Sequence, residues 1–157
     1  MPDGLYERDA LAWAERQVDL LRRLAAGERL NEAIDWPNVI EEVQDVGLSE
    51  LRSCKSLLRQ ALVHLLKLHA WPGSMAAAHW PGEAVGFIAD ARDRFTPSMR
   101  QRIILTEVYR TALVQVRTEA DDVGEPRPLP EACPFVLDDL LDPNADVRAL
   151  VVKIGNP

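Results

Sequence analysis

The sequence lacks any long uninterrupted apolar run. No stretch approaches the roughly 20 apolar residues that a membrane-spanning helix requires. The N-terminal segment carries Asp3, Glu7 and Asp9 within its first ten residues and has no apolar core of the kind a signal peptide needs. We therefore expect a protein that is neither secreted nor bound to a membrane, and we predict a cytoplasmic location.

Cysteine is also scarce, because the chain has only Cys54 and Cys133. Cys54 lies inside a helical pattern, whereas Cys133 directly precedes Pro134, so the two occur in unrelated contexts. This usage favours reduced thiols over a disulfide. Cys133 has no basic neighbour in sequence that would lower its pKa, and a core or loop cysteine is favoured over a nucleophile.

The short motifs of the common enzyme classes are missing. The eight glycines are dispersed, so no phosphate-binding loop is present, and neither a Gly-x-Ser-x-Gly elbow nor a His-Glu-x-x-His pair occurs. The position three residues before each of the three histidines holds alanine or leucine, which excludes the Glu-x-x-His motif of di-iron bundles. These absences leave the question of an enzymatic activity open and predict no cofactor.

Basic residues are fewer than acidic ones, 18 against 25, which gives a formal charge of -7. Such a balance repels phosphate backbones and anionic lipid surfaces, so we expect neither nucleic acid nor membrane as a partner. One helical segment does carry several arginines, namely Arg100, Arg102, Arg110 and Arg117. The negative charge therefore disfavours a nucleic-acid regulator, and these arginines are the one feature that supports it.

What the sequence does contain is helical periodicity along most of its 157 residues, 47% of which are apolar. These features predict an all-α fold, a bundle of about four main helices plus a short C-terminal helix. The length fits a single domain over residues 1–157. Within it, residues 143–157 form an extension whose structure the pattern does not specify.

Helix boundaries follow from prolines, glycines and capping residues: Gly27 is the predicted stop of the first helix, and Pro37 fits the first turn of the second. The third predicted helix follows the small-residue loop Gly73–Ala78, and the fourth follows Thr96 and Pro97, read as an N-cap and a first-turn proline. Four prolines make Asp121–Pro134 a loop. The predicted helices are Leu5–Leu24, Trp36–Trp71, Pro81–Arg94, Ser98–Glu119 and Phe135–Leu141.

Polar residues intrude on the apolar faces of the first two predicted helices. In the second, a wheel of about 100° per residue places Val39, Val43 and Val46 on one apolar arc with the leucines that follow. Glu50 falls inside this arc, His64 on its edge and Glu42 just outside it, with Asp45 nearer solvent. In the first helix, Asp9 and Gln17 share a stripe with Tyr6 and Trp13.

A buried carboxylate is costly unless it is paired, so we expect Asp9 and Glu50 to find partners on other helices. The favoured interpretation is a polar network that fixes helix register. The alternative is an inward-facing site that binds a metal, although Glu50 and His64 lie about 21 Å apart along one helix. No metal ligand is assigned. The candidate polar cluster comprises Asp9, Gln17, Glu42, Asp45, Glu50 and His64.

The sequence resembles a known protein family in the residues just described and in several further motifs. The motifs are Tyr6, Asp9, Trp13 and Gln17; Asn38–Gly47 with Ser49 and Glu50; His64–Lys67 with Pro72; Trp80; Thr96–Arg100; Tyr109 with Ala112; Cys133–Phe135; and Leu140–Pro143. Together they resemble the bacterial domain-of-unknown-function family 29, from Leu5 to Pro143. The resemblance implies a helical fold and a bacterial, cytoplasmic origin, and it implies no activity. Residues 144–157 extend beyond the family pattern.

Two functions follow as hypotheses. The first is a non-enzymatic interaction or regulatory module, whose partner is a second copy of the chain or another protein. The missing catalytic motifs and the helical content support it. The second is a metal-binding or hydrolytic bundle that uses the inward-facing carboxylates and His64, and the polar residues on apolar faces support that one.

Overall fold

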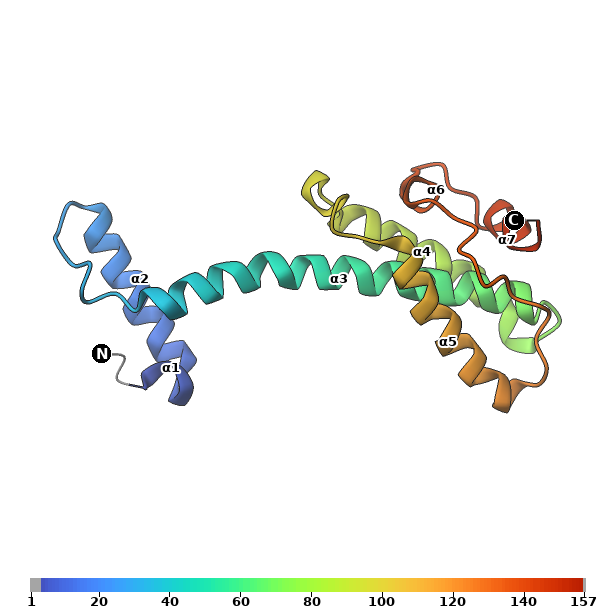
Figure 1. The fold of residues 1–157 in the computed structure, drawn as a ribbon, viewed down its shortest axis with the longest axis horizontal. Helices are drawn as coiled ribbons and strands as arrows, with labels where there is room; N and C mark the ends of the chain where they lie inside the picture. The colour runs from blue at the N-terminus through green and yellow to red at the C-terminus, as the bar shows by residue number, and fades with distance from the viewer. Residues whose placement is uncertain (1–3, 157) are drawn as a thin grey trace. The chain divides into compact units, whose positions relative to one another are not determined.

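The protein is built from α-helices and the loops that join them (Figure 1). The computed structural model describes residues 4–156, and for side chains all of these except 121 and 122. Within that range no residue lies in a strand, so the predicted all-α class is confirmed. The long helices are α2 (Ala10–Ala25), α3 (Trp36–Ala70), α4 (Trp80–Arg94) and α5 (Leu105–Val123), and the short ones are α1 (Leu5–Arg8), α6 (Leu137–Leu141) and α7 (Val147–Gly155).

Residue contacts divide the chain into two compact units, which we call the N-terminal unit (Met1–Ser49) and the C-terminal unit (Glu50–Pro157). The dividing line falls inside α3. The N-terminal unit therefore holds α1, α2 and the first part of α3. That residues 1–157 form a single domain stays a prediction. Over the described part of the chain, each helix is either too short or too polar to cross a bilayer.

The N-terminal unit begins with a break that the sequence analysis did not predict. In place of one helix over Leu5–Leu24, the chain leaves the helical conformation at Asp9, whose φ of -154° and ψ of 84° end α1. The side chain of Asp9 then caps α2 by accepting a hydrogen bond from the Ala12 amide at 3.0 Å. The predicted stop at Gly27 agrees with the structure, because α2 ends at Ala25 and Gly27 adopts a φ of +96°.

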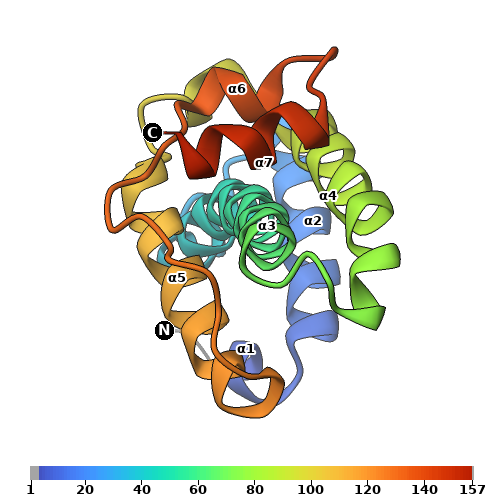
Figure 2. The same cartoon turned by 90° about the vertical axis from the view of Figure 1, so that its right-hand side faces the viewer.

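The C-terminal unit is organised around the second part of α3. Figure 2 views α3 almost end-on, with α4 and α5 on opposite sides of it and α6 and α7 along a third side. The side chains of Cys54, Leu58, Leu62 and Leu65 are completely buried. They join one continuous core to which α4, α5, α6 and α7 all contribute. This core contains most of the buried apolar surface that stabilises the described chain.

The segment after Thr96 differs from its prediction. Instead of a helix from Ser98 to Glu119, Pro97–Met99 form one 3₁₀ turn, and the long helix α5 begins only at Leu105. The hydroxyl of Thr96 contacts the Ser98 hydroxyl at 3.1 Å and caps no helix. Met99 and Ile103 are both buried, so the chain bends here to place two apolar side chains in the core.

The C-terminal extension, left unassigned by the sequence, forms part of the core. Asp146 caps α7 by accepting a hydrogen bond from the Arg148 amide at 3.0 Å. Val147, Leu150 and Ile154, spaced along one face of α7, are all buried. The Nζ atom of Lys153 contacts Asp139 at 2.7 Å and so joins α7 to α6. Residues 147–154 are therefore an integral part of the C-terminal unit.

Candidate interaction surface

The six predicted polar residues fall into both units. Asp9, Gln17, Glu42 and Asp45 belong to the N-terminal unit, whereas Glu50 and His64 belong to the C-terminal unit. Across the described residues, no three or more His, Cys, Asp or Glu side chains gather closely enough to hold a metal ion. The role of each residue therefore follows from its own contacts.

Gln17 is the buried polar residue of the N-terminal unit, with 5% of its surface exposed. Its Oε1 atom accepts a hydrogen bond of 2.9 Å from the backbone amide of Asp35, just before α3. The Asp35 carboxylate in turn accepts hydrogen bonds from the Trp13 indole at 3.0 Å and the Asn38 amide at 2.7 Å. This network attaches the start of α3 to α2.

Glu42 contacts α1. The Tyr6 hydroxyl donates a hydrogen bond of 2.7 Å to its carboxylate, and the ring of Tyr6 packs edge-on against Trp13 with ring centroids 4.8 Å apart. The hydrogen bond to Glu42, with partial burial and the negative charges of Glu41 and Asp45, raises the pKa of Tyr6 to about 12. Glu42 therefore joins α3 to α1 within this unit.

Asp9 and Glu50 were both expected to be buried, and that expectation is wrong. Each is exposed. Asp9 is the cap of α2, because the chain breaks where the wheel assumed a continuous helix. Glu50 lies 3.4 Å from Arg94 of α4, and both side chains of this ion pair are about half exposed. A pair of this kind contributes little to stability.

His64 is nearly buried, with 12% of its side chain exposed. Its Nδ1 atom lies 2.7 Å from the Gln60 carbonyl oxygen, and its Nε2 atom lies 3.0 Å from a carboxylate oxygen of Glu83. Both ring nitrogens thus face oxygen atoms of the chain itself. In this arrangement His64 joins α3 to α4, and neither nitrogen is directed at an open coordination position.

The most unusual feature of the N-terminal unit is apolar. At about 100° per residue, residues 36–49 of α3 place no charged residue on one face roughly 120° wide, and Glu50, the first residue of the C-terminal unit, is the first charged residue on that face. We call this face the α3 apolar arc. Its members are Trp36, Val39, Ile40, Val43, Val46 and Gly47.

This arc is largely uncovered. Val43 is 70% exposed and Val46 68% exposed, and Trp36 and Ile40 are exposed as well. Glu41 and Asp45 lie on the opposite side of the helix and are exposed, whereas Glu42 lies just outside the arc and accepts the hydrogen bond of Tyr6. The helix therefore leaves an apolar face uncovered, whereas an amphipathic helix in a monomeric globular unit buries that face.

Sequence reasoning identified Val39, Val43 and Val46 as apolar arc residues but assigned them to a core. It did not identify Tyr6 and Asp35 as the partners of Glu42 and Gln17. The signal available for Asp35 was its place just before Trp36 and Pro37, where a helix start offers unpaired amides. For Tyr6 the sequence held no signal of a partner on another helix.

Comparison with known proteins agrees with this architecture. The crystal structure of an α-helical protein of unknown function from Rhodospirillum rubrum matches with a TM-score of 0.73 and 30% sequence identity, over 95% of this chain and 96% of that one. No curated protein matches the sequence. The model of the family described as domain of unknown function DUF29 matches residues 5–145. The chain therefore belongs to the DUF29 family, for which no function is assigned.

Proposed function

We propose that this protein is a non-enzymatic, cytoplasmic interaction module that self-associates, two copies packing their α3 apolar arcs against each other. The exposure of Val43 and Val46 supports the proposal most strongly. Burial of such side chains removes apolar surface from water, which is the main driving force of protein association. The partner is a protein and not a nucleic acid, in keeping with the formal charge of -7.

The small core of the N-terminal unit supports the proposal that this unit binds a partner. Within its described residues the buried side chains are those of Trp13, Gln17, Leu20 and Ile34. A unit of this size gains little stability from so small a core, because a single core below roughly 70 residues rarely suffices. Covering the α3 apolar arc would add the apolar contacts that the unit lacks.

A second copy suits this surface better than an unrelated partner because the arc is complementary to itself. In an antiparallel two-fold contact, one register places Trp36 opposite Gly47 and Ile40 opposite Val43. Gly47 has open space where a Cβ atom would lie, so the indole of Trp36 finds room there. Glu41 and Asp45 lie on the far side of each helix, and Glu42 lies just outside the arc. In this register Glu50 lies beyond the paired residues 36–47, so like charges stay away from the centre of the contact.

Light scattering of the full chain during gel filtration tests the proposal. We expect a mass near twice the 17.6 kDa of one chain for the wild type. The substitution Val43→Lys places a charge in the centre of the contact and should give the single-chain mass. Val114→Lys is the matched control, since Val114 is also exposed but belongs to α5, and it should keep the doubled mass.

Two results would contradict the proposal. One is a wild-type mass of 17.6 kDa at concentrations of about 100 μM. The other is a doubled mass that Val43→Lys leaves unchanged while its circular dichroism shows a folded helical protein. The second result would place the contact elsewhere on the surface.

A further inference from the structure

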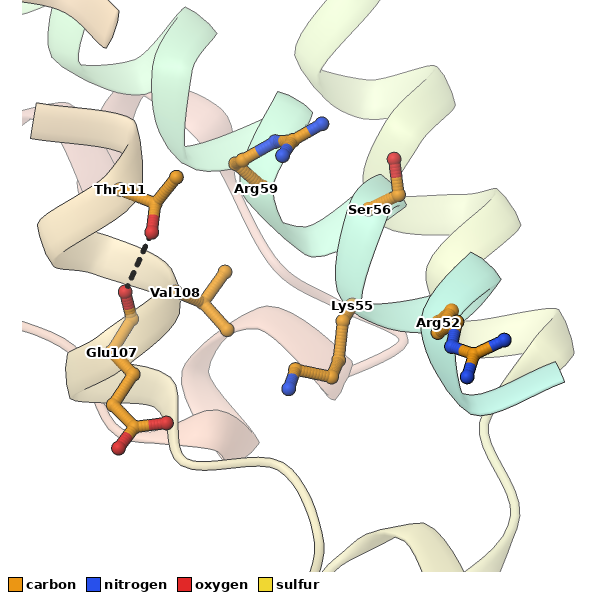
Figure 3. Close-up of a pocket in the computed structure, with 7 residues that line it drawn as sticks. All are labelled: Arg52, Lys55, Ser56, Arg59, Glu107, Val108 and Thr111. Carbon is orange, nitrogen blue, oxygen red and sulfur yellow. Dashed lines mark hydrogen bonds between the residues drawn. The ribbon is translucent and has the colours of Figure 1, made fainter. Parts of the chain in front are cut away.

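The C-terminal unit has a basic pocket that the proposed self-association does not use. It lies between α3 and α5 and has a volume of about 290 Å³ (Figure 3). Three cationic side chains of α3, Arg52, Lys55 and Arg59, line one wall, and Glu107 and Thr111 of α5 lie opposite. A volume near 300 Å³ is at the small end of the range for pockets that bind metabolites.

The three cations share one face of α3 because they are spaced three and four residues apart. Within the described residues none of the three forms an ion pair, whereas Arg94, Arg100 and Arg117 of the same unit each contact a carboxylate. Like charges on adjacent turns repel, and a chain with seven excess negative charges offers many carboxylates that could have neutralised them. Three unneutralised cations along one pocket wall therefore favour an anionic ligand.

Arg59 provides a second, independent observation. Its Nε atom is buried and, over the described part of the chain, has no hydrogen-bond partner. A buried Nε–H donor without an acceptor costs free energy, and an oxyanion bound by the Arg59 side chain would supply the acceptor. In Figure 3 the ammonium group of Lys55 extends into the space in front of α5, one turn from Arg59 along α3.

The remaining wall residues refine the chemistry. Ser56 and Thr111 add hydroxyl groups at the pocket, and Val108 adds an apolar surface. Glu107, the carboxylate of the pocket wall, forms no ion pair with any of the three cations within the described residues. Arginine forks match the oxygens of phosphate groups, and three cations together suit a multiply charged anion.

We infer that this pocket binds a small phosphorylated molecule, held by Arg52, Lys55 and Arg59 through its phosphate oxygens. A single phosphate and a pyrophosphate group share this chemistry, and the ligand can be inorganic or organic. The inference does not depend on self-association, because every residue of the pocket belongs to the C-terminal unit.

Calorimetric titration of the full chain with inorganic pyrophosphate tests the inference, with inorganic phosphate and ribose 5-phosphate as parallel ligands. We expect saturable binding below about 1 mM for at least one of them, weakened by added salt. Tighter binding of ribose 5-phosphate than of inorganic phosphate would identify the ligand as an organic phosphate. The reverse order would identify it as a free phosphate.

Substitutions at the pocket distinguish it from other basic surfaces. Lys55→Gln and Arg59→Gln should each weaken pyrophosphate binding about tenfold, as loss of a charge-assisted hydrogen bond does. Glu107→Gln should strengthen binding because it removes a like charge. Arg110→Gln is the matched control, since Arg110 is an exposed arginine of α5 outside the pocket, and it should change nothing.

Three results would overturn the inference. The first is no saturable binding of any of the three ligands at 10 mM, and the second is binding that Lys55→Gln and Arg59→Gln leave unchanged. The third is a single-stranded oligonucleotide that binds through the same residues more tightly than pyrophosphate. In any variant that remains folded, titration with pyrophosphate can also be followed by the amide resonances of the protein. Resonances of α3 and α5 that shift together would confirm that pyrophosphate binds in the pocket between these two helices.

Discussion

The two parts of α3 carry the same apolar pattern and meet different surroundings. In the C-terminal unit, Leu58, Leu62 and Leu65 are completely buried by the helices around them. In the N-terminal unit, Val43 and Val46 continue the pattern yet remain mostly exposed. Helical periodicity therefore shows which face of a helix needs cover, but it does not show what provides the cover. In this protein we propose that a second copy provides it.

The largest expected change in stability is at the buried part of α3, in the C-terminal unit. Leu62→Ala should lower the free energy of unfolding by about 3 kcal/mol, because it leaves a cavity in the core. Val114→Ala, at an exposed position of α5, should change it by less than about 0.5 kcal/mol. Urea unfolding followed by circular dichroism measures both. A loss below about 1 kcal/mol for Leu62→Ala would show that the core of the C-terminal unit is loosely packed.

Substitution of Gln17 in the N-terminal unit should lower the free energy of unfolding by a smaller amount. Gln17→Leu keeps the volume but leaves the Asp35 amide without its acceptor, which should cost about 1–3 kcal/mol. The damage should be local, so hydrogen exchange at Asp35 should accelerate while amides in the second part of α3 remain protected.

Glu15→Gln, an exposed change on the same helix, is the control for that experiment and should leave exchange at Asp35 unaltered. Equal acceleration throughout α3 after Gln17→Leu would instead show that the two units unfold together. That result would support the predicted single domain over residues 1–157.

The smallest expected effect concerns the ionisation of the two tyrosines, one of which lies in each unit. The pKa of Tyr6 is raised to about 12 mainly by its hydrogen bond to Glu42, and the pKa of Tyr109 is raised to about 12 mainly by burial. Both folded values lie above the usual 10, so the stability that each neutral hydroxyl contributes is complete below pH 10 and is lost as the pH rises through about 12. Ultraviolet absorbance should show almost no tyrosinate in the folded protein at pH 10.5.

Glu42→Gln separates these two causes. It should lower the pKa of Tyr6 towards 10 and leave that of Tyr109 in place, so that one of two tyrosines ionises early. If both tyrosines shift together, or neither does, the contact between Tyr6 and Glu42 does not control the ionisation of Tyr6.

The sequence predicted the secondary structure well where a local signal ended a helix. Gly27 stops α2, and Pro37 lies in the first turn of α3. It failed at Asp9, because a capping residue inside an apolar pattern can end one helix and start another, and a helical wheel assumes continuity. It failed at Thr96, because Thr96 caps no helix and Pro97–Met99 form only a 3₁₀ turn before α5 begins at Leu105. The buried face of α7 was missed for a related reason, since Val147, Leu150 and Ile154 form too short a pattern to assign without the helices that cover them.

The candidate site was predictable only in part. The network around Gln17 follows from one polar residue on an apolar stripe, and the structure supplies its partner, Asp35. The basic pocket had a signal that the sequence analysis did not use, the spacing of Arg52, Lys55 and Arg59 on one helical face. Its opposite wall comes from α5, about 50 residues later in the chain, and no local pattern could have located it.

The most direct test of the account is an isotope-filtered nuclear Overhauser experiment on a mixture of labelled and unlabelled copies. It reports only contacts between different molecules. If two copies meet through the α3 apolar arc, the methyl groups of Ile40 in one copy should contact those of Val43 in the other. Intermolecular contacts confined to other residues, or none at concentrations where Val43 and Ile40 give strong signals, would contradict it.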